Sequence, residues 1–351
     1  MSTNNIYSYY NDKEVFQTDN IMRWLKLPYQ RITLEDLSVK RNGVLVVSVK
    51  QFNSFDEMIE LLKNKFDKVI VINDDNSAAF PQQIDNFFIL GYELKYNKKN
   101  MNFTKNEFNF NYVHCRVAFE KTIIGLPDIV NTLKDRIRNK YYTNLNRYPK
   151  IHRLELMEYI LENNYFDLGY NSFVYSSDKV ETLFPNKYKK TKNILPVILD
   201  LNRFDNDWNL PDPYTNSDGI PYQYTLDSYL QLVTETQYEG EGITWTSEKI
   251  VKPFVSMNFM LLLAQPGTLT WWKNMGFETF DFLFDESYDT ELDDKKRLEL
   301  VFSQLKSFVS MSLKDINNLY YENFKLLEHN YNHYQIYANN ELNKVRNLIN
   351  G

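Results

Sequence analysis

Cysteine, histidine and glycine are all scarce in this chain of 351 residues, which has 1 Cys, 4 His and 10 Gly. The single Cys115 excludes an intrachain disulfide and a zinc site built from cysteines, and it fits a reducing compartment. With so few histidines, we expect neither a catalytic triad based on histidine nor a zinc cluster.

Long apolar runs and a basic excess are missing as well. No run approaches the roughly 20 apolar residues of a membrane-spanning helix, and the polar start MSTNNIYSYYNDKE lacks the apolar core of a signal peptide. We therefore expect a soluble, cytoplasmic protein with no membrane span. The net charge of 40 − 46 = −6 argues against a dedicated nucleic-acid-binding protein, although a local basic groove can exist within an acidic total.

Three motifs that mark large enzyme classes are also absent. The chain has no G-x-x-x-x-G-K-[ST], which disfavours a P-loop NTPase, and no G-x-G-x-x-G after a strand, which disfavours a dinucleotide-dependent dehydrogenase. It has no G-x-S-x-G, the turn that carries the nucleophile of many hydrolases. A functional site must therefore be sought in the arrangement of strands, turns and charges.

The sequence does contain the alternation of a parallel α/β sheet. The β-branched run at 43–49 and the run at 68–72 are typical of buried parallel strands, and residues 55–66 between them carry apolar side chains at helical spacing. Strand-like runs at 87–90 and 112–119 extend the sheet. We expect the fold class α/β, with a doubly wound sheet in the N-terminal half.

Two adjacent carboxylates, Asp74 and Asp75, follow the strand at 68–72. The carboxyl end of a strand is where α/β folds place functional groups, so both are candidate catalytic residues. The alternative is a polar turn that caps the following helix.

A basic turn opens the second half of the chain. A short strand at 141–146 leads into Arg147, and Arg153 lies in the first turn of the helix that follows. A cation at a helix N-terminus opposes the helix macrodipole unless an anion binds there too, and a phosphate suits both the arginine and the free amides. The alternative is a surface arginine paired with Glu155 or Glu158.

The stretch at 228–289 repeats the pattern of strand, loop, helix start, strand, turn and helix. Lys249 lies at its predicted helix start, so Lys249 and Arg153 together suit a diphosphate. When a sugar leaves a nucleotide donor, negative charge develops on the diphosphate, and fixed cations stabilise that charge without a metal. The alternative for Lys249 is a solvated lysine.

Two carboxylates accompany these cations. Glu248 lies beside Lys249, and Glu235 ends the preceding strand. A carboxylate repels phosphate but accepts hydrogen bonds from ribose or sugar hydroxyls. The alternative for Glu248 is a residue of the first helical turn, where the helix dipole favours a negative charge.

Two patterns resemble metal sites but fit simpler roles. Asp205-Asn206-Asp207 has the D-x-D spacing of metal-dependent glycosyltransferases, yet no strong strand precedes it, so we expect a solvated acidic loop. His329 and His333 are four apart on a predicted helix with no third ligand nearby in sequence, so we expect helix-surface residues. We therefore expect no metal and no cofactor.

The order of several short motifs resembles glycosyltransferases of the GT-B fold, most closely the α-1,3-fucosyltransferase-like group and its uncharacterised phage and bacterial relatives. The resemblance covers about residues 141–310. It rests on LNR at 145–147, HRL at 152–154, SEKIVKPF at 247–254, QPGTL at 265–269, GFETF at 276–280 and DESYD at 285–289. Ser247 replaces the usual Thr, and the loop at 239–242 is acidic, so the base or sugar pocket differs from that of the group.

This resemblance implies two Rossmann-like domains that face each other across a cleft. Residues 1–135 would bind the acceptor and residues 136–312 the nucleotide sugar. Two helices are predicted at the end, over 295–310 and 313–349, and the segment 313–351 would pack back towards the N-terminal domain. The implied activity is metal-independent transfer of a sugar from a nucleotide-diphosphate donor, the co-substrate, to an acceptor hydroxyl.

The resemblance also assigns roles to single residues. Arg153 and Lys249 would contact the donor diphosphate, and Glu248 a donor hydroxyl. The remaining members of the expected donor site are Asn146, Arg147, Glu235 and Ser247. The general base that deprotonates the acceptor would be Asp74 or Asp75, with three glutamates as further possibilities, namely Glu93, Glu107 and Glu120.

The acceptor stays open at this point. Glycans are the default for the fucosyltransferase-like group. The composition and the phage relatives suggest instead a hydroxymethylated base of viral DNA, flipped out of the duplex in the host cytoplasm. The basic stretch at 134–150 would then hold DNA phosphates, whereas its first part, 134–140, is otherwise interpreted as a solvated helix face. A third hypothesis is a non-catalytic module that binds a nucleotide sugar on a decayed enzyme fold.

Overall fold

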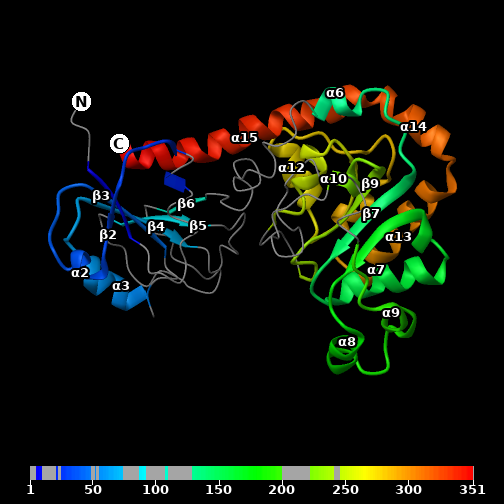
Figure 1. The fold of residues 1–351 in the computed structure, drawn as a ribbon, viewed down its shortest axis with the longest axis horizontal. Coiled ribbons are helices and arrows are strands. Elements are labelled where there is room, and N and C mark those ends of the chain that lie inside the picture. The colour runs from blue at the N-terminus through cyan, green and yellow to red at the C-terminus, as the bar shows by residue number, and fades with distance from the viewer. Residues whose placement is uncertain are drawn as a thin grey trace. The chain divides into compact units, whose positions relative to one another are not determined.

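The computed structural model describes residues 5–9, 21–22, 25–48, 52, 55–73, 87–91, 107–109, 129–199, 222–240 and 246–350 (Figure 1). The chain divides into two compact units. Unit 1 comprises Met1–Cys115 with Tyr337–Gly351, and unit 2 comprises Arg116–Ile336. Several predicted features lie outside the described residues, namely Asp74, Asp75, Glu93, Cys115, Glu120, the strand at 112–119 and the acidic loop at 205–207.

Unit 1 is built on a parallel sheet whose described strands follow the order β2-β1-β3-β4-β5-β6. The strands are β1 (Ile6–Tyr9), β2 (Gln30–Ile32), β3 (Val44–Ser48), β4 (Lys68–Asn73), β5 (Phe87–Gly91) and β6 (Glu107–Asn109). Two helices connect them, α2 (Leu34–Leu37) and α3 (Phe55–Leu62). The predicted βαβ unit of β3, α3 and β4 is confirmed.

The core of unit 1 explains why β3 and β4 read as continuous apolar runs. Both faces of these strands are buried, as parallel strands require. Leu45 and Val69 point to the face where Met58 of α3 packs. In Figure 1, α2 and α3 lie on one side of the sheet and the C-terminal part of the last helix on the other.

Unit 2 is built on a second parallel sheet, with the order β10-β9-β7-β8. Its strands are β7 (Lys140–Asn146), β8 (Gly169–Phe173), β9 (Ser228–Thr234) and β10 (Phe259–Leu263). The fold class is therefore α/β with two parallel sheets, as predicted. The cleft between the two units stays a prediction.

The described helices that begin and end within unit 2 pack around this sheet and against one another. They are α6 (Ile129–Leu133), α7 (Ile151–Glu162), the 3-10 helix η2 (Phe166–Leu168), α8 (Ser177–Leu183), α9 (Lys189–Ile194), α10 (Tyr222–Thr225), α11 (Lys252–Val255), α12 (Thr268–Asn274), the 3-10 helix η3 (Glu286–Thr290), α13 (Asp294–Ser310) and α14 (Leu313–Glu322). Helices α7 and α13 lie side by side, joined by the stacked rings of Tyr159 and Phe302 at 4.3 Å.

A polar ladder occupies one face of the central strand β7. Asn146 donates through Nδ2 to Asn144 Oδ1 at 2.7 Å, and Asn144 donates to Asn171 Oδ1 of β8 at 3.2 Å. All three side chains are buried. Because each amide is hydrogen-bonded to its neighbour, β7 carries polar groups into the core without unpaired atoms. The same hydrogen bonds fix the position of Asn146 at the carboxyl end of the strand.

The predicted solvated helix face at 134–140 is wrong. Helix α6 ends at Leu133, and Asp135 adopts a positive φ of 63° that breaks the helix. Arg138 is 1% exposed, with its guanidinium 4.1 Å from the ring centroid of Tyr320 and its Nη1 donating to Ser228 O at 3.0 Å. A cation is tolerated there because an aromatic face and a carbonyl replace its water.

The C-terminal helices follow the prediction with one break. Helix α13 covers the first predicted helix, but the second is divided at Asn323 into α14 and α15 (Phe324–Asn350). The long C-terminal helix is thus confirmed as α15. Its residues up to Ile336 belong to unit 2, and those from Tyr337 belong to unit 1.

His329 and His333 attach α15 to the end of α12. Their rings stack at 5.5 Å, and their Nε2 atoms lie 3.0 Å from Gly276 O and 2.7 Å from Met275 O respectively. A Cβ added to Gly276 would lie 2.7 Å from His333 Nε2. The pair therefore joins the start of α15 to the end of α12.

Gly276→Ala is expected to lower the stability of unit 2 through backbone strain at φ +92° and through the clash with His333. We expect a loss of roughly 1–3 kcal/mol, measured as a lower thermal unfolding midpoint. Gly267→Ala is the matched control, because Gly267 has φ +81° but nothing within 4 Å of an added Cβ. Equal losses in the two variants would show that the His333 contact is not tight.

Candidate functional site

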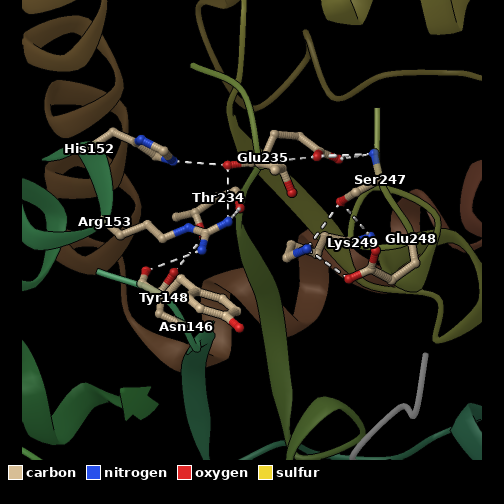
Figure 2. A network of polar contacts seen from close by, with 10 residues as sticks. Asn146, Tyr148, His152, Arg153, Thr234, Glu235, Ser247, Glu248 and Lys249 are labelled. Atoms are coloured by element: carbon tan, nitrogen blue, oxygen red, sulfur yellow. Dashed lines mark hydrogen bonds and ion pairs between the residues drawn. The ribbon is translucent and has the colours of Figure 1, made fainter. Parts of the chain in front are cut away.

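The candidate site lies at the carboxyl ends of β7 and β9, which are neighbours in the sheet (Figure 2). Strand β7 ends at Asn146 and leads through a basic turn into α7. Strand β9 ends at Thr234, and the turn at 246–251 comes back to the same place. The two segments that the sequence singled out, 146–153 and 235–249, are therefore adjacent in space.

Arg153 is the buried centre of this arrangement, 3% exposed. Its Nη1 donates to Tyr148 O at 3.2 Å, and its Nη2 donates to Thr234 O and Glu235 O, both at 3.1 Å. Its Nε is buried and has no hydrogen-bond partner within the described part of the chain. Burial lowers the pKa of Arg153, and Glu235 and Glu248 act in the opposite direction.

The alternative of a surface arginine paired with Glu155 or Glu158 is wrong. Glu155 accepts a hydrogen bond from Tyr188 Oη at 2.9 Å, and Glu158 accepts from Thr191 N and Oγ1 at 2.9 and 2.7 Å. Both carboxylates thus hold the segment around α9, and Arg153 instead donates to the carbonyls at the end of β9.

The start of α7 is not capped by a side chain. Its N-cap residue is Lys150, which forms no side-chain cap, and the first turn has no acidic residue. Arg153 N and Leu154 N both donate to Lys150 O, so the amides of Ile151 and His152 precede the first helical hydrogen bond. Such amides and the helix dipole favour an anion.

His152 is a member of the site that the sequence did not reveal. It is 4% exposed, its Nε2 lies 3.0 Å from Glu235 O, and its ring stacks on Tyr238 at 4.8 Å. Burial, and then the charge of Arg153, lower its pKa to about 3. The imidazole is therefore neutral and donates to the carbonyl as the Nε2–H tautomer.

Arg297 of α13 is a second residue that was missed. It is 1% exposed, its guanidinium lies 4.3 Å from the ring centroid of Tyr238, and its Nη2 donates to Tyr238 O at 2.6 Å. A signal for it was present, because Arg297 falls on the apolar stripe of α13 with Val301 and Leu305. Together His152 and Arg297 fix Tyr238 and its loop.

Glu235 joins the two halves of the site. Its carbonyl accepts from His152 and Arg153, and its carboxylate accepts from Ser247 N, with both oxygens at 3.1 Å, and from Thr236 N at 3.0 Å. The residue is 0% exposed. In this arrangement Glu235 positions Ser247.

Glu248 and Lys249 form an ion pair beside Ser247. Lys249 Nζ donates to Glu248 Oε1 at 2.7 Å and to Ser247 Oγ at 3.2 Å. Burial acts to raise the pKa of Glu248, but Lys249 and Lys252 outweigh it and hold that pKa at about 2. Glu248 is thus a carboxylate that only accepts hydrogen bonds, and its side chain is still 10% exposed.

The predicted position of these two residues in a first helical turn is wrong. They lie in a turn that precedes α11, which begins at Lys252. Pro253 sets that start, because proline is favoured in the first helical turn, where its missing N–H is no loss. The helix dipole therefore does not explain the charge of Glu248. Lys249 and Lys252 keep this carboxylate ionised.

The remaining predicted donor residues differ in their exposure. Asn146 is buried, with Nδ2 bonded to Asn144 and Oδ1 accepting from Thr234 Oγ1 at 2.6 Å, so it supports the end of β9. Arg147 is exposed, with its guanidinium 5.8 Å from the ring centroid of Tyr148. Asn146 thus lies beneath the site and Arg147 at its surface.

Three cations converge at this end of the sheet. Burial lowers the pKa of Lys150, and the charges of Arg153 and Lys249 lower it further, while Glu239 and Glu235 act in the opposite direction. Lys150 Nζ donates to Thr236 O, and Lys249 retains a 26% exposed side chain. The cluster of Lys150, Arg153 and Lys249 therefore offers positive charge to a ligand.

The DESYD motif has a structural role that the sequence did not show. Asp289 accepts from Leu269 N at 2.8 Å and Thr270 N at 3.0 Å, so a carboxylate already caps α12. Glu286 accepts from Thr279 Oγ1 and Phe280 N at 2.8 and 2.9 Å. The start of α12 is therefore already covered by a carboxylate, whereas the N-cap residue of α7 forms no side-chain cap.

A cluster of metal ligands and a membrane-spanning helix are both absent from the residues that the structure describes. No group of three or more His, Cys, Asp or Glu side chains lies close enough to hold a metal ion there. None of the helices in those ranges combines the length and the apolarity needed to span a membrane. The proposed general bases Asp74 and Asp75 lie outside these residues, and Glu107 begins β6.

The lowered pKa of His152 predicts a pH effect on stability. In the folded state His152 binds a proton only near pH 3, whereas an unfolded histidine binds one near pH 6.5. Protonation therefore favours the unfolded state, and the stability that neutral His152 contributes is lost as the pH falls below about 6.5. When the pH falls from about 7 to about 5, the free energy of unfolding of the wild type should decrease by about 2 kcal/mol more than that of His152→Gln. Urea unfolding at both pH values measures this, and identical losses would contradict it.

Comparison with known proteins gives similarity of structure only. No family profile and no curated protein sequence matches this chain. An α1,3-fucosyltransferase with GDP-fucose is 9% identical, with a TM-score of 0.40 over 93% of this chain and 90% of that one. A trehalose-6-phosphate synthase from Burkholderia multivorans is 12% identical, with a TM-score of 0.37 over 89% and 73%. A wall teichoic acid polymerase is 9% identical, with a TM-score of 0.30 over 93% and 89%.

Proposed function

We propose that this protein is a glycosyltransferase that takes its sugar from a nucleotide-diphosphate donor. One observation carries the proposal: Lys150, Arg153 and Lys249 converge at the carboxyl ends of β7 and β9, beside the uncapped start of α7. This edge of a parallel α/β sheet is where such folds bind nucleotides. The motif resemblance to the α-1,3-fucosyltransferase-like group places its donor contacts on two of these residues, Arg153 and Lys249.

The chemistry follows from charge. When the bond between the sugar and the diphosphate breaks, a negative charge grows on the leaving oxygen. Lys249 and the amides of Ile151 and His152 supply positive potential that is in place before the reaction begins. Arg153 contributes its charge and its unpaired Nε, because its Nη atoms are used by carbonyls. This stabilisation needs no metal.

Glu248 supplies selectivity for hydroxyl groups. With a pKa of about 2 it stays ionised, so it accepts hydrogen bonds and repels phosphate. Its pairing with Lys249 places an acceptor for hydroxyls next to a cation for phosphate. A nucleotide sugar carries both groups side by side, whereas a free phosphate carries only one of them.

The acceptor side keeps its alternatives. We retain Asp74 and Asp75 as the proposed general base, and a glycan as the default acceptor. For the DNA alternative, Arg138 of the basic stretch at 134–150 is buried and out of reach of phosphates, while Lys134 and Arg147 are exposed. Transfer to glycan or to hydroxymethylated duplex DNA is tested by supplying each with labelled donor. Donor binding without transfer to any acceptor, and without slow hydrolysis, would favour the non-catalytic module.

Thermal unfolding with UDP-, GDP-, CMP- and ADP-sugars tests the donor site. A nucleotide sugar at ~100 times its dissociation constant should stabilise the protein by roughly 2.7 kcal/mol. Lys249→Gln should weaken that binding about tenfold to a hundredfold, because a hydrogen bond to a charged group is worth about 1.5–3 kcal/mol. Isothermal titration measures the change.

Lys273→Gln is the matched control for this variant. Lys273 lies on α12 in the same unit and is also paired with carboxylates, those of Asp281 and Glu286. Its loss should leave the affinity for the nucleotide sugar unchanged. If none of the nucleotide sugars shifts the wild type, or if Lys249→Gln binds as the wild type does, the donor-site proposal is wrong.

A further inference from the structure

Two tyrosines form a pair at the edge of the candidate site. Tyr148 lies in the turn between β7 and α7, and Tyr175 lies in the loop between β8 and α8, with ring centroids 5.1 Å apart and planes tilted by 41°. Tyr148 is 53% exposed. Tyr175 is half-buried and packs on the core cluster that includes Phe173. One ring is thus fixed by the core, and the other lies against it in solvent.

The backbone segments that carry the two rings are both fixed by hydrogen bonds. Tyr148 O accepts from Arg153 Nη1 at 3.2 Å, and Val174 N, next to Tyr175, donates to Asn146 O at 3.3 Å. The loop of Tyr175 then enters α8 through the Ser176 cap. Exposed aromatic rings on ordered loops lose little further freedom when a ligand covers them, which favours binding.

The position of the pair indicates what it binds. The backbone carbonyl of Tyr148 accepts a hydrogen bond from Arg153. The ring of Tyr148 is therefore attached to a residue that directly contacts the cationic cluster. In a nucleoside diphosphate the base is joined to the phosphates by a single ribose. Ionised Glu248 accepts from hydroxyls such as those of a ribose. A flat base has a π face for stacking, whereas a sugar ring is surrounded by hydroxyls.

We propose that Tyr148 and Tyr175 form the stacking platform for the nucleobase of the donor. This inference rests on the proposed function. The pair recognises the aromatic face of the base and the cationic cluster recognises the diphosphate, so the two contributions are separable. Stacking is tolerant of base identity, and Arg147 adds a cation over the Tyr148 ring, 5.8 Å from its centroid.

Isothermal titration with UDP, GDP, ADP and inorganic pyrophosphate tests the platform on the full chain. Tyr148→Ala should weaken binding of the nucleoside diphosphates by roughly 5- to 150-fold and leave pyrophosphate unchanged. Tyr148→Phe keeps the ring and should bind as the wild type does. Tyr175→Leu should weaken the same ligands, and circular dichroism checks that each variant is folded.

Leu183→Ala is the control for a general loss of exposed apolar surface, since Leu183 is 47% exposed at the end of α8, the helix that follows Tyr175, but has no aromatic face. It should bind within about twofold of the wild type. Lys249→Gln should weaken nucleoside diphosphates and pyrophosphate alike. If Lys249→Gln has this effect while Tyr148→Ala has none, the platform is wrong and the donor site stands.

Two other outcomes overturn the inference. If Leu183→Ala weakens binding as much as Tyr148→Ala does, the effect comes from a general disturbance of the fold and not from the ring. If the wild type binds none of the nucleoside diphosphates, the proposed function fails and the platform fails with it.

Discussion

The contacts of Glu235 hold the candidate site in place. Its carbonyl fixes the first turn of α7 through His152 and Arg153, and its carboxylate fixes Ser247 in the returning loop. Breaking a buried charged network by removing one partner costs about 3–5 kcal/mol, so these segments are held firmly. The cations are therefore in position before any ligand arrives, which is the condition for electrostatic catalysis.

The site is also a balance of charge. Lys150, Arg153 and Lys249 would repel one another at this end of the sheet without the carboxylates of Glu235 and Glu248. The two carboxylates differ in burial, since Glu235 is 0% exposed and the side chain of Glu248 is 10% exposed. Glu235 therefore offsets the cations inside the core, and Glu248 does so closer to solvent.

The sequence predicts the strands of the site well, but it does not predict which of its polar side chains are buried. The apolar run of β9 and the turn before α7 follow from local pattern, so Arg153 was found at its helix start. Arg138 and His152 were misjudged or missed because their partners are carbonyls far away in the sequence, at Ser228 and Glu235. Burial of a polar side chain depends on such distant acceptors.

Helix α15 has a consequence for how the chain can be divided. Its residues from Tyr337 belong to unit 1, and Ala338, Leu342, Val345 and Ile349 there are buried. A cut in the middle of the chain would therefore leave the first fragment without part of its own core. To express unit 1 alone, the segment 337–351 must be supplied with residues 1–115, either as an added peptide or as a fusion in a permuted chain.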